Sequence, residues 1–565
     1  MGVLLALFVA SQYGYALRVP FINDDFLFLD KTRDASFVSL WQPNALAFHW
    51  YRPWSRELHY WTLQKIFGAH EPPFHVASFA LALIALTGFY ALTRRMAGGA
   101  AAAIATAGAA SMAAWGVPMV WAAGVQDLWL LVWSMVFLAS VIRGSRRWAA
   151  VTLVLALMSK ETAVVLPGIA VAYQLLIERR SLRETVRWAV PLGVIVAAWA
   201  IFHPVLGGRW WRPIPDPHEP GLNPPFVSVL LRTLGLAFNL DGRPAPEQGW
   251  REALVAAAAG AVLLGALALA GGWRLARSRG SEKAPLTAFG MVWAALGWLP
   301  LLMPNLGWHA YYGLLGALGA WLAVAVNVAR YPVGATVLVV ALALLRGARA
   351  DTPSRDWGSE SYQRRAASFL GVMRSDLLDQ VPKPSPHTRF YFVRVPSNVG
   401  FLAGDGPALR VWYGDPTLRA GYYPAYRPRT SMEPDGPDLF FRYDSTAGWV
   451  QIRPGRENVA KAQTANPRWA TDHQVLAQTL AGADNWSGAL AEYLKVAGAD
   501  TLNVENAFNV GVCYEALGDT LSAARWYTRA AALPGADEQV RAVARQVQGR
   551  LPDARGAGGS RRRNP

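Results

Sequence analysis

The chain has 565 residues, of which 53% are hydrophobic and only 16% are charged. Because an average soluble chain is about 25% charged, this composition excludes an ordinary soluble protein and indicates a membrane protein in contact with lipids. The net charge of +16 would favour nucleic acid in a soluble protein, but here many basic residues cluster in short gaps between apolar blocks, so we predict no nucleic-acid partner.

Long apolar runs predict a mainly α-helical, polytopic membrane bundle over residues 1–349, because a span needs about 20 mostly apolar residues. About eleven runs approach this length. They are Val3–Leu17, Val76–Leu92, Gly98–Met119, Leu128–Val141, Trp148–Met158, Ala163–Ile177, Trp188–Val205, Leu254–Trp273, Leu286–Met303, Leu314–Val328 and Val333–Leu345.

The basic residues predict how these spans cross the membrane. Lys and Arg gather in alternate gaps, which the positive-inside rule assigns to the cytoplasm. We therefore expect an inner-membrane protein whose C-terminal half is extracytoplasmic. Arg346 and Arg349 fit this less well, because they follow the last span on the outer side. The gaps between spans that alternate with the basic ones are then assigned to the outer face, namely 18–75, 122–127, 159–162, 207–251 and 304–312.

Two adjacent acids, Asp24 and Asp25, follow the first span in the stretch PFINDDFLFLD. Apolar neighbours such as Phe21 and Phe26 would partly desolvate them, and neighbouring acids raise one another's pKa. A carboxylate with a raised pKa is a good general base near neutral pH. We predict that Asp24 is the catalytic carboxylate and that Asp25 supports it. The alternative is an N-terminal cap for a helix that starts near Phe26.

Other polar and aromatic residues fall in the gaps that are assigned to the same outer face. Ionisable groups at membrane depth are costly and tend to mark function. Two simpler interpretations remain, an ion pair of Lys160 with Glu161 and an interfacial imidazole at His309, and the aromatic residues also suit a membrane-interface belt. The candidates are Arg52, Asp127, Lys160, Glu161, Arg212, His309, Tyr311 and Tyr312.

The first outer segment contains a stretch from Pro53 to Phe67 that reads as a helix. Trp54 and Trp61 would lie on one side and Tyr60 on roughly the opposite side. Such a helix can recline in the interface plane, with lipid on one side and protein on the other. We expect it to cover a cavity beside the acid pair, and the alternative is a plain membrane-anchored loop.

The C-terminal half has the composition of a soluble protein. We predict a small α/β extracytoplasmic domain over 351–466, with a helix at Ser361–Val381 and strands at Arg389–Val395, Ala408–Tyr413 and Leu439–Ile452. It shows no catalytic motif.

A repeat with the tetratricopeptide period of 34 residues follows over 467–552. The single cysteine, Cys513, lies within it and excludes an intrachain disulfide. We predict a protein partner for these helices and a disordered basic tail over 553–565. The positions that recur are Ala477, Ala489, Tyr493 and Val496, which return as Gly511, Ala523, Tyr527 and Ala530.

Several stretches together resemble the GT-C membrane glycosyltransferases, in particular the transmembrane-and-tetratricopeptide O-mannosyltransferases and their bacterial relatives. They are NDDFLFL, YRPW followed by PPFHVASFALAL, WAAGVQDLWLLVWSMVFLAS, LMSKETAVVLP and GWHAYYGLLGALG. The order of these stretches, over roughly residues 20 to 330, and the repeats after them follow the family pattern.

The resemblance implies a sugar donor on a polyprenyl phosphate and an acidic residue that acts on the acceptor hydroxyl. Asp24 and Asp25 match the acidic pair, Arg52 the arginine of the Tyr-Arg-Pro stretch, and Lys160 with Glu161 the family's Lys-Glu. The chain departs from the pattern where relatives have Gly-Arg before an acidic residue, since it has Gly124-Val125 before Asp127. It also has His309 where a more basic residue is common.

The residues suit this chemistry without the family. A carboxylate can deprotonate the attacking hydroxyl, and cations such as Arg52, Lys160 and Arg212 can hold the leaving phosphate. The acid pair can instead hold Mg²⁺ or Mn²⁺. The resemblance further implies transfer of a sugar such as mannose to a protein or glycan hydroxyl, with Ser and Thr as protein acceptors. The alternatives are an oligosaccharide ligase or polymerase of the O-antigen type and a non-enzymatic lipid-sugar transporter.

Overall fold

The structure is a computed structural model. It describes residues 2–42, 50–205, 226–241, 283–302, 308–351, 358–393, 405–422, 426, 429, 432–444, 446–452, 467–499, 503–533, 536 and 538–549. The chain divides into two compact units, which are described separately. The first comprises residues 1–379 with 410–416, and the second comprises 380–409 with 417–565. The predicted span Leu254–Trp273, Arg212 and the basic tail lie outside the described residues.

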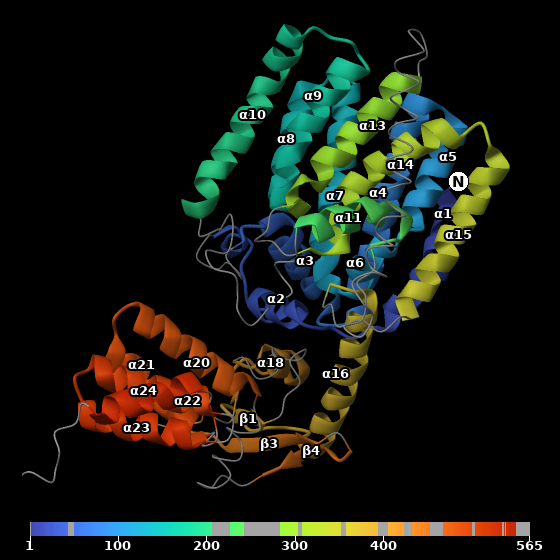
Figure 1. The fold of residues 1–565 in the computed structure, drawn as a ribbon. Helices are drawn as coiled ribbons and strands as arrows, with labels where there is room; N and C mark the ends of the chain where they lie inside the picture. The colour runs from blue at the N-terminus through green and yellow to red at the C-terminus, as the bar shows by residue number, and fades with distance from the viewer. Residues whose placement is uncertain are drawn as a thin grey trace, which may run out of the picture. The chain divides into compact units, whose positions relative to one another are not determined.

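The first unit is a bundle of α-helices joined by short 3₁₀ turns (Figure 1). Its α-helices are α1 (Gly2–Tyr13), α2 (Asp24–Thr32), α3 (His59–Phe67), α4 (Glu71–Ala97), α5 (Gly99–Ala110), α6 (Gly116–Val120), α7 (Val125–Ile142), α8 (Arg146–Leu157), α9 (Leu166–Leu176), α10 (Leu182–Val205), α11 (Phe226–Gly235), α13 (Lys283–Trp298), α14 (Leu314–Val328), α15 (Pro332–Asp351) and α16 (Glu360–Gln380). The 3₁₀ turns are η1 (Gly14–Arg18), η2 (Ser39–Trp41), η5 (Ala113–Trp115), η6 (Ala122–Gly124), η7 (Glu161–Val165), η9 (Leu236–Phe238), η10 (Leu299–Leu302) and η11 (Ala310–Gly313), and η4 (Pro53–Leu58) is a π-helix.

Six helices among the described residues are long and apolar enough to cross a membrane, which supports a multi-pass membrane protein. A bent pair, α5 with the η5–α6 segment, makes a seventh if it counts as one span. The predicted count of about eleven is not confirmed, because α1, α8 and the helix from Glu161 to Leu176 are too short. The six are Glu71–Ala97, Ala122–Ile142, Leu182–His203, Lys283–Leu302, Ala310–Val328 and Pro332–Ala350.

Glycines let α13 and α14 touch backbone to backbone at the centre of the bundle. A Cβ built on Gly297 would lie 2.5 Å from the Cα of Gly316, and one on Gly290 would lie 2.8 Å from the carbonyl oxygen of Gly319. Small residues at such crossings are typical of helix packing in membranes, where close van der Waals contact drives association. This contact makes α14 the most buried of the candidate spans.

The helices α10 and α15 lie at opposite margins of the bundle (Figure 1). Their outward faces are apolar and exposed, with Val190 and Val194 on α10 and Val337 and Leu344 on α15. Exposed apolar stripes of this length suit contact with lipid.

The two arginines that fit the orientation rule poorly are both neutralised inside the first unit. The Arg346 guanidinium donates to both Oε atoms of Glu360, at 2.8 and 2.9 Å, and Arg349 pairs with Asp241. Tyr15 also donates to Glu360, whose side chain is buried. The folded unit therefore compensates both charges at the end of α15.

The second unit contains a four-stranded sheet of order β2-β1-β3-β4, in which β1 is parallel to β2 and β3 and β4 is antiparallel to β3. The predicted strand Leu439–Ile452 is a hairpin of two strands. The predicted strand Ala408–Tyr413 is wrong, because these residues form the helix α18 (Pro407–Tyr413). Proline suits the first position of a helix, and consecutive residues from Ala408 to Arg410 are buried, which an alternating strand pattern would not give. The strands are β1 (Arg389–Val393), β2 (Arg419–Tyr422), β3 (Asp438–Asp444) and β4 (Gly448–Gln451).

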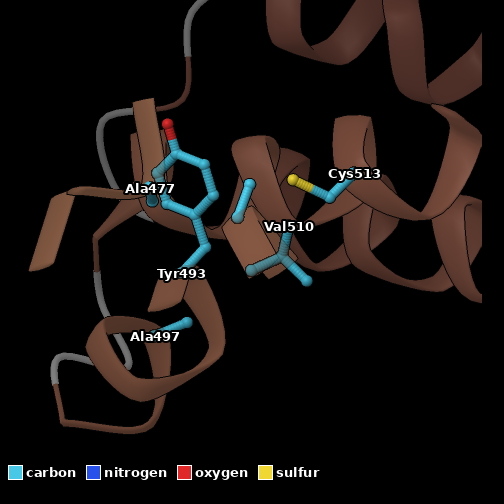
Figure 2. Packing of buried hydrophobic residues seen from close by; sticks show 6 residues of the cluster. Ala477, Tyr493, Ala497, Val510 and Cys513 are labelled. Carbon is cyan, nitrogen blue, oxygen red and sulfur yellow. The ribbon is translucent and has the colours of Figure 1, made fainter. Parts of the chain in front are cut away.

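Among the described residues, five helices follow the sheet: α20 (Pro467–Gly482), α21 (Trp486–Ala499), α22 (Val504–Ala516), α23 (Thr520–Ala532) and α24 (Glu538–Gly549). Figure 2 shows one of their cores, in which Ala477, Tyr493, Val510 and Cys513 come from three successive helices. All residues at the predicted repeat positions are buried. The packing needs the small residue at Gly511, since a Cβ there would lie 2.8 Å from the Tyr527 ring. The tetratricopeptide assignment itself stays a prediction.

Candidate active site

Asp25 is a buried carboxylate near the start of α2, and both of its oxygens accept hydrogen bonds. Its Oδ1 accepts hydrogen bonds from the Tyr60 hydroxyl at 2.7 Å and from the Ala123 backbone N–H at 2.8 Å. Its Oδ2 accepts from the Ile22 backbone N–H at 2.9 Å. Burial raises the pKa of Asp25 to about 7, although these three hydrogen bonds act in the opposite direction. Asp25 therefore ties α2 to α3 and to the turn before α7.

Asp24 differs from its neighbour, because within the described part of the chain it accepts no hydrogen bond and forms no ion pair. Its side chain is half-buried rather than fully enclosed. Burial raises the pKa of Asp24 to about 7, and the positive charges of Arg56 and Arg52 oppose the rise. The carboxylate is therefore able to accept a proton from a ligand near neutral pH.

The turn that presents the acid pair has an unusual backbone. Asn23 has φ +50° and ψ −121°, a region that residues other than glycine rarely occupy. The Asn23 side chain donates to the Gln363 Oε1 on α16 at 2.8 Å, which fixes the turn. The helix begins at Asp24 rather than near Phe26, and Asn23 makes no capping hydrogen bond through its side chain. The alternative prediction, that the acids cap a helix starting near Phe26, is therefore wrong.

Residues 410–416, which belong to the first unit, hold the rest of α2. Arg410 forms an ion pair with Asp30, with nitrogen–oxygen distances of 2.7 to 2.9 Å. The Trp412 ring packs edge-on against Phe26, with ring centroids 5.6 Å apart. Both contacts restrain the helix that carries Asp24.

Arg52 is held by two partners and keeps donors for a third. Its Nε and Nη2 donate to the two Oε atoms of Glu161 at 2.8 and 2.6 Å, and its Nη1 donates to the Gln126 Oε1 at 2.6 Å. A guanidinium has five N–H donors, so two have no partner among the described residues. The Trp50 ring lies 5.1 Å from the guanidinium carbon.

The segment that carries Arg52 continues as the π-helix η4 and then as α3, so the predicted helix from Pro53 to Phe67 is confirmed. The Ser55 hydroxyl donates to the Ser159 carbonyl oxygen at 2.7 Å, next to Lys160. Farther along, Trp54 packs against Trp129 on α7. These contacts join the first outer segment to the loop after α8 and to α7. Whether the helix reclines in the membrane interface stays a prediction.

Lys160 pairs with Asp127, not with Glu161, and both side chains are buried. The ammonium nitrogen also lies 4.0 Å from the centroid of the Tyr312 ring. The buried His309 ring stacks on Tyr311, at 5.8 Å between centroids, and meets Tyr312 edge-on at 5.4 Å. Segments far apart in the sequence thus gather their cationic and aromatic groups in one place.

The structure therefore brings nearly all predicted site residues together. Asp24 lies within electrostatic range of Arg52, and Tyr311 lies within range of both Asp24 and Asp127. Arg212 lies outside the described residues. The sequence did not point to Tyr60 or to Gln126, since a lone phenol and a lone amide are common residues without a distinctive pattern.

The residues do not fit the divalent ion that was an alternative for the acid pair. Both oxygens of Asp25 already accept hydrogen bonds from the protein. Within the described ranges, no group of three or more His, Cys, Asp or Glu side chains is arranged to hold a metal ion. We therefore propose no chemical step through a metal.

The known structures to which the chain is similar have low sequence identity and low TM-scores. No protein-family model and no curated protein matches the chain. The crystal structure of ArnT from Cupriavidus metallidurans in the apo state is 15% identical with a TM-score of 0.44, and the structure bound to undecaprenyl phosphate has a TM-score of 0.41; each match covers 79% of this chain and 93% of that chain. The Archaeoglobus fulgidus oligosaccharyltransferase is 13% identical with a TM-score of 0.37, over 74% of this chain and 62% of that chain. Similarities this weak carry no conclusion about function.

Proposed function

We propose that the chain is a GT-C-type membrane glycosyltransferase, which moves a sugar from a polyprenyl-phosphate donor to a hydroxyl group on the outer face of the membrane. The observation that carries the proposal is that Asp24, a carboxylate with no hydrogen bond or ion pair in the described ranges, lies within electrostatic range of Arg52, which keeps two N–H donors. One group can take a proton and the other can hold a phosphate.

The chemistry uses each group once. Asp24 takes the proton of the acceptor hydroxyl as the oxygen attacks the anomeric carbon. The bond between this carbon and the phosphate oxygen breaks, and its electron pair leaves with the phosphate. In this proposal Arg52 and Lys160 stabilise the negative charge that develops on the leaving phosphate. The products are the glycoside and the prenyl phosphate, and Asp24 then releases its proton to solvent.

The site also explains why the cations are bonded to carboxylates. Glu161 and Asp127 fix the directions of Arg52 and Lys160 before a ligand arrives, so little side-chain ordering remains for the binding step. His309, Tyr311 and Tyr312 form the aromatic wall beside Lys160 and are proposed to support the donor.

We further propose that the C-terminal half is extracytoplasmic and that the helices from Pro467 onward recruit a protein acceptor or a partner, as tetratricopeptide repeats would. Mannose is the first sugar to test, and Ser and Thr are the first acceptors. Fusing alkaline phosphatase after Leu551 should give an active enzyme, and a fluorescent protein at the same place should stay dark. An inactive phosphatase and a bright fluorescent protein would contradict the orientation.

The function is tested with purified protein in detergent or nanodiscs and a panel of single sugars on polyprenyl phosphate, offered with hydroxyl acceptors. Transfer of one sugar, with release of prenyl phosphate, supports the proposal. Transfer of a preassembled glycan only would identify the oligosaccharide ligase or polymerase instead. Movement of lipid-linked sugar across a vesicle membrane without chemistry would identify a transporter.

A further inference from the structure

A continuous path of hydrogen bonds joins the acid pair to the phosphate-binding arginine. The Ala123 backbone N–H donates to the Asp25 Oδ1 at 2.8 Å. The carbonyl oxygen of the same residue accepts from the Gln126 Nε2 at 3.0 Å. The Oε1 of Gln126 then accepts from the Arg52 Nη1 at 2.6 Å. The path runs through η6 and the first turn of α7 and connects the two halves of the proposed site.

Gln126 is the only side chain on this path between the two charged groups among the described residues. It uses both ends of its amide, the nitrogen as a donor to a carbonyl and the oxygen as an acceptor from a guanidinium. Its side chain is buried, so water does not compete for either bond. An isosteric acid cannot donate from the carboxylate to Ala123, and an aliphatic side chain can make neither bond.

The Gln126 amide is neutral, so it adds no negative charge beside the Nη1 of Arg52. Glu161 already supplies a carboxylate to Arg52 through two hydrogen bonds. A neutral acceptor at Nη1 holds the guanidinium in place without adding a second negative charge. A phosphate that approaches the two remaining N–H donors therefore meets less repulsion than it would beside a second carboxylate.

We infer that Gln126 is the positioning residue that sets the distance and angle between the base and the phosphate-binding arginine. This inference rests on the proposed function, since it concerns the same site. Gln126 is not itself a base or a phosphate ligand in the proposed reaction. It acts through Arg52 on one side and through Ala123 and Asp25 on the other.

Two substitutions separate its two bonds. Gln126→Leu keeps the size but removes both hydrogen bonds, and it leaves Arg52 paired with Glu161, so the donor still binds at a poorly oriented cation. We expect kcat to fall by about ten- to hundredfold, the range of a hydrogen bond to a charged group, with the KM for donor within about threefold. Gln126→Glu keeps the contact with Arg52 but adds a negative charge beside the phosphate. We expect the KM for donor to rise by about tenfold or more.

Gln174→Leu is the matched control, because Gln174 is a buried glutamine on α9 whose side chain, within the described residues, makes no hydrogen bond to the acids or the cations of the site. It should change neither kcat nor KM. All variants are compared at equal folded amounts, from thermal unfolding and size-exclusion chromatography in the same detergent. If Gln126 were merely structural, both variants would have a lower unfolding temperature, and the loss of kcat in Gln126→Leu would not be separate from the rise of KM in Gln126→Glu.

The outcomes are distinct. Two results overturn the inference and leave the proposed function standing, provided that the wild type transfers sugar. In one, both Gln126 variants behave like Gln174→Leu. In the other, both variants show the same lowered kcat and the same raised KM. If the wild type transfers no sugar from any polyprenyl-phosphate donor, the proposed function fails and the inference fails with it. The split of kcat and KM between Leu and Glu supports the inference.

Discussion

Replacing each acid of the pair by its amide, one at a time, should separate activity from stability. Asp24 has no hydrogen bond among the described residues, so Asp24→Asn removes a base without removing a contact. General-base catalysis is usually worth about 10²–10⁴-fold, and transfer should fall by that factor. Above pH 7, Asp24→Asn should be at least as stable as the wild type, since the pKa of Asp24 is about 7 in the fold against 3.8 for an ordinary aspartate. The ionised carboxyl therefore costs the folded state free energy that the amide does not.

Asp25→Asn should behave in the opposite way. The two carboxylate oxygens accept from Ile22, Tyr60 and Ala123. Whichever way the new amide turns, its nitrogen faces a donor, so at least two buried polar groups lose a partner. Each such group costs about 1–3 kcal/mol, which gives about 2–6 kcal/mol of lost unfolding free energy.

The assay is thermal unfolding in detergent together with transfer rate per folded molecule, for the wild type and both amides. If Asp24→Asn retains more than about a tenth of the wild-type rate, Asp24 is not the base, because the smallest expected loss is larger. If Asp25→Asn is as stable as Asp24→Asn, the hydrogen bonds described for Asp25 do not hold the site. If Asp25→Asn is stable and inactive, the two roles are exchanged.

Three further changes test other parts of the site. The transfer rate should rise with pH through about pH 7, because the base, with its pKa raised to about 7 by burial, is protonated and inactive below that value; a flat profile from pH 5.5 to 8.5 would contradict this. Arg52→Ala should weaken donor binding by about ten- to hundredfold and also destabilise the fold by leaving Glu161 unpaired. Adding Glu161→Gln should restore stability but not donor binding, and recovery of both would remove Arg52 from the donor site. Gly358→Ala should lower transfer, since its Cβ would overlap the His309 Nδ1 and must displace that ring. Gly347→Ala is the control, with nothing within 4 Å of its Cβ, and equal effects of the two would argue against a role for His309.

The residues of the candidate site could be singled out because charge in an apolar context is conspicuous in a sequence. Lys160 and Glu161 interrupt an apolar hairpin, and the acid pair follows an apolar run, so each stands out without knowledge of its partners. The partners could not be predicted in the same way. Lys160 pairs with Asp127 and Glu161 with Arg52, and these choices depend on how four separate segments pack.

The elements that failed did so for local reasons. The segment from Ala408 to Tyr413 mixes apolar, basic and aromatic residues as a strand does, but Pro407 begins a helix there. Several predicted spans are short helices because apolar composition alone does not fix helix length, and turns such as η7 interrupt them. Gln126 gave no signal, since its importance lies in two hydrogen bonds that only the fold creates.

In the proposed mechanism Arg52 binds the lipid phosphate while Asp24 removes the proton of the acceptor hydroxyl. The most direct test measures donor binding and sugar transfer together in the purified wild type and in Asp24→Asn. Both proteins should bind the polyprenyl-phosphate sugar with affinities within about threefold, while transfer falls at least a hundredfold in the variant. Loss of donor binding in parallel with transfer, or transfer at near wild-type rate, would contradict this mechanism.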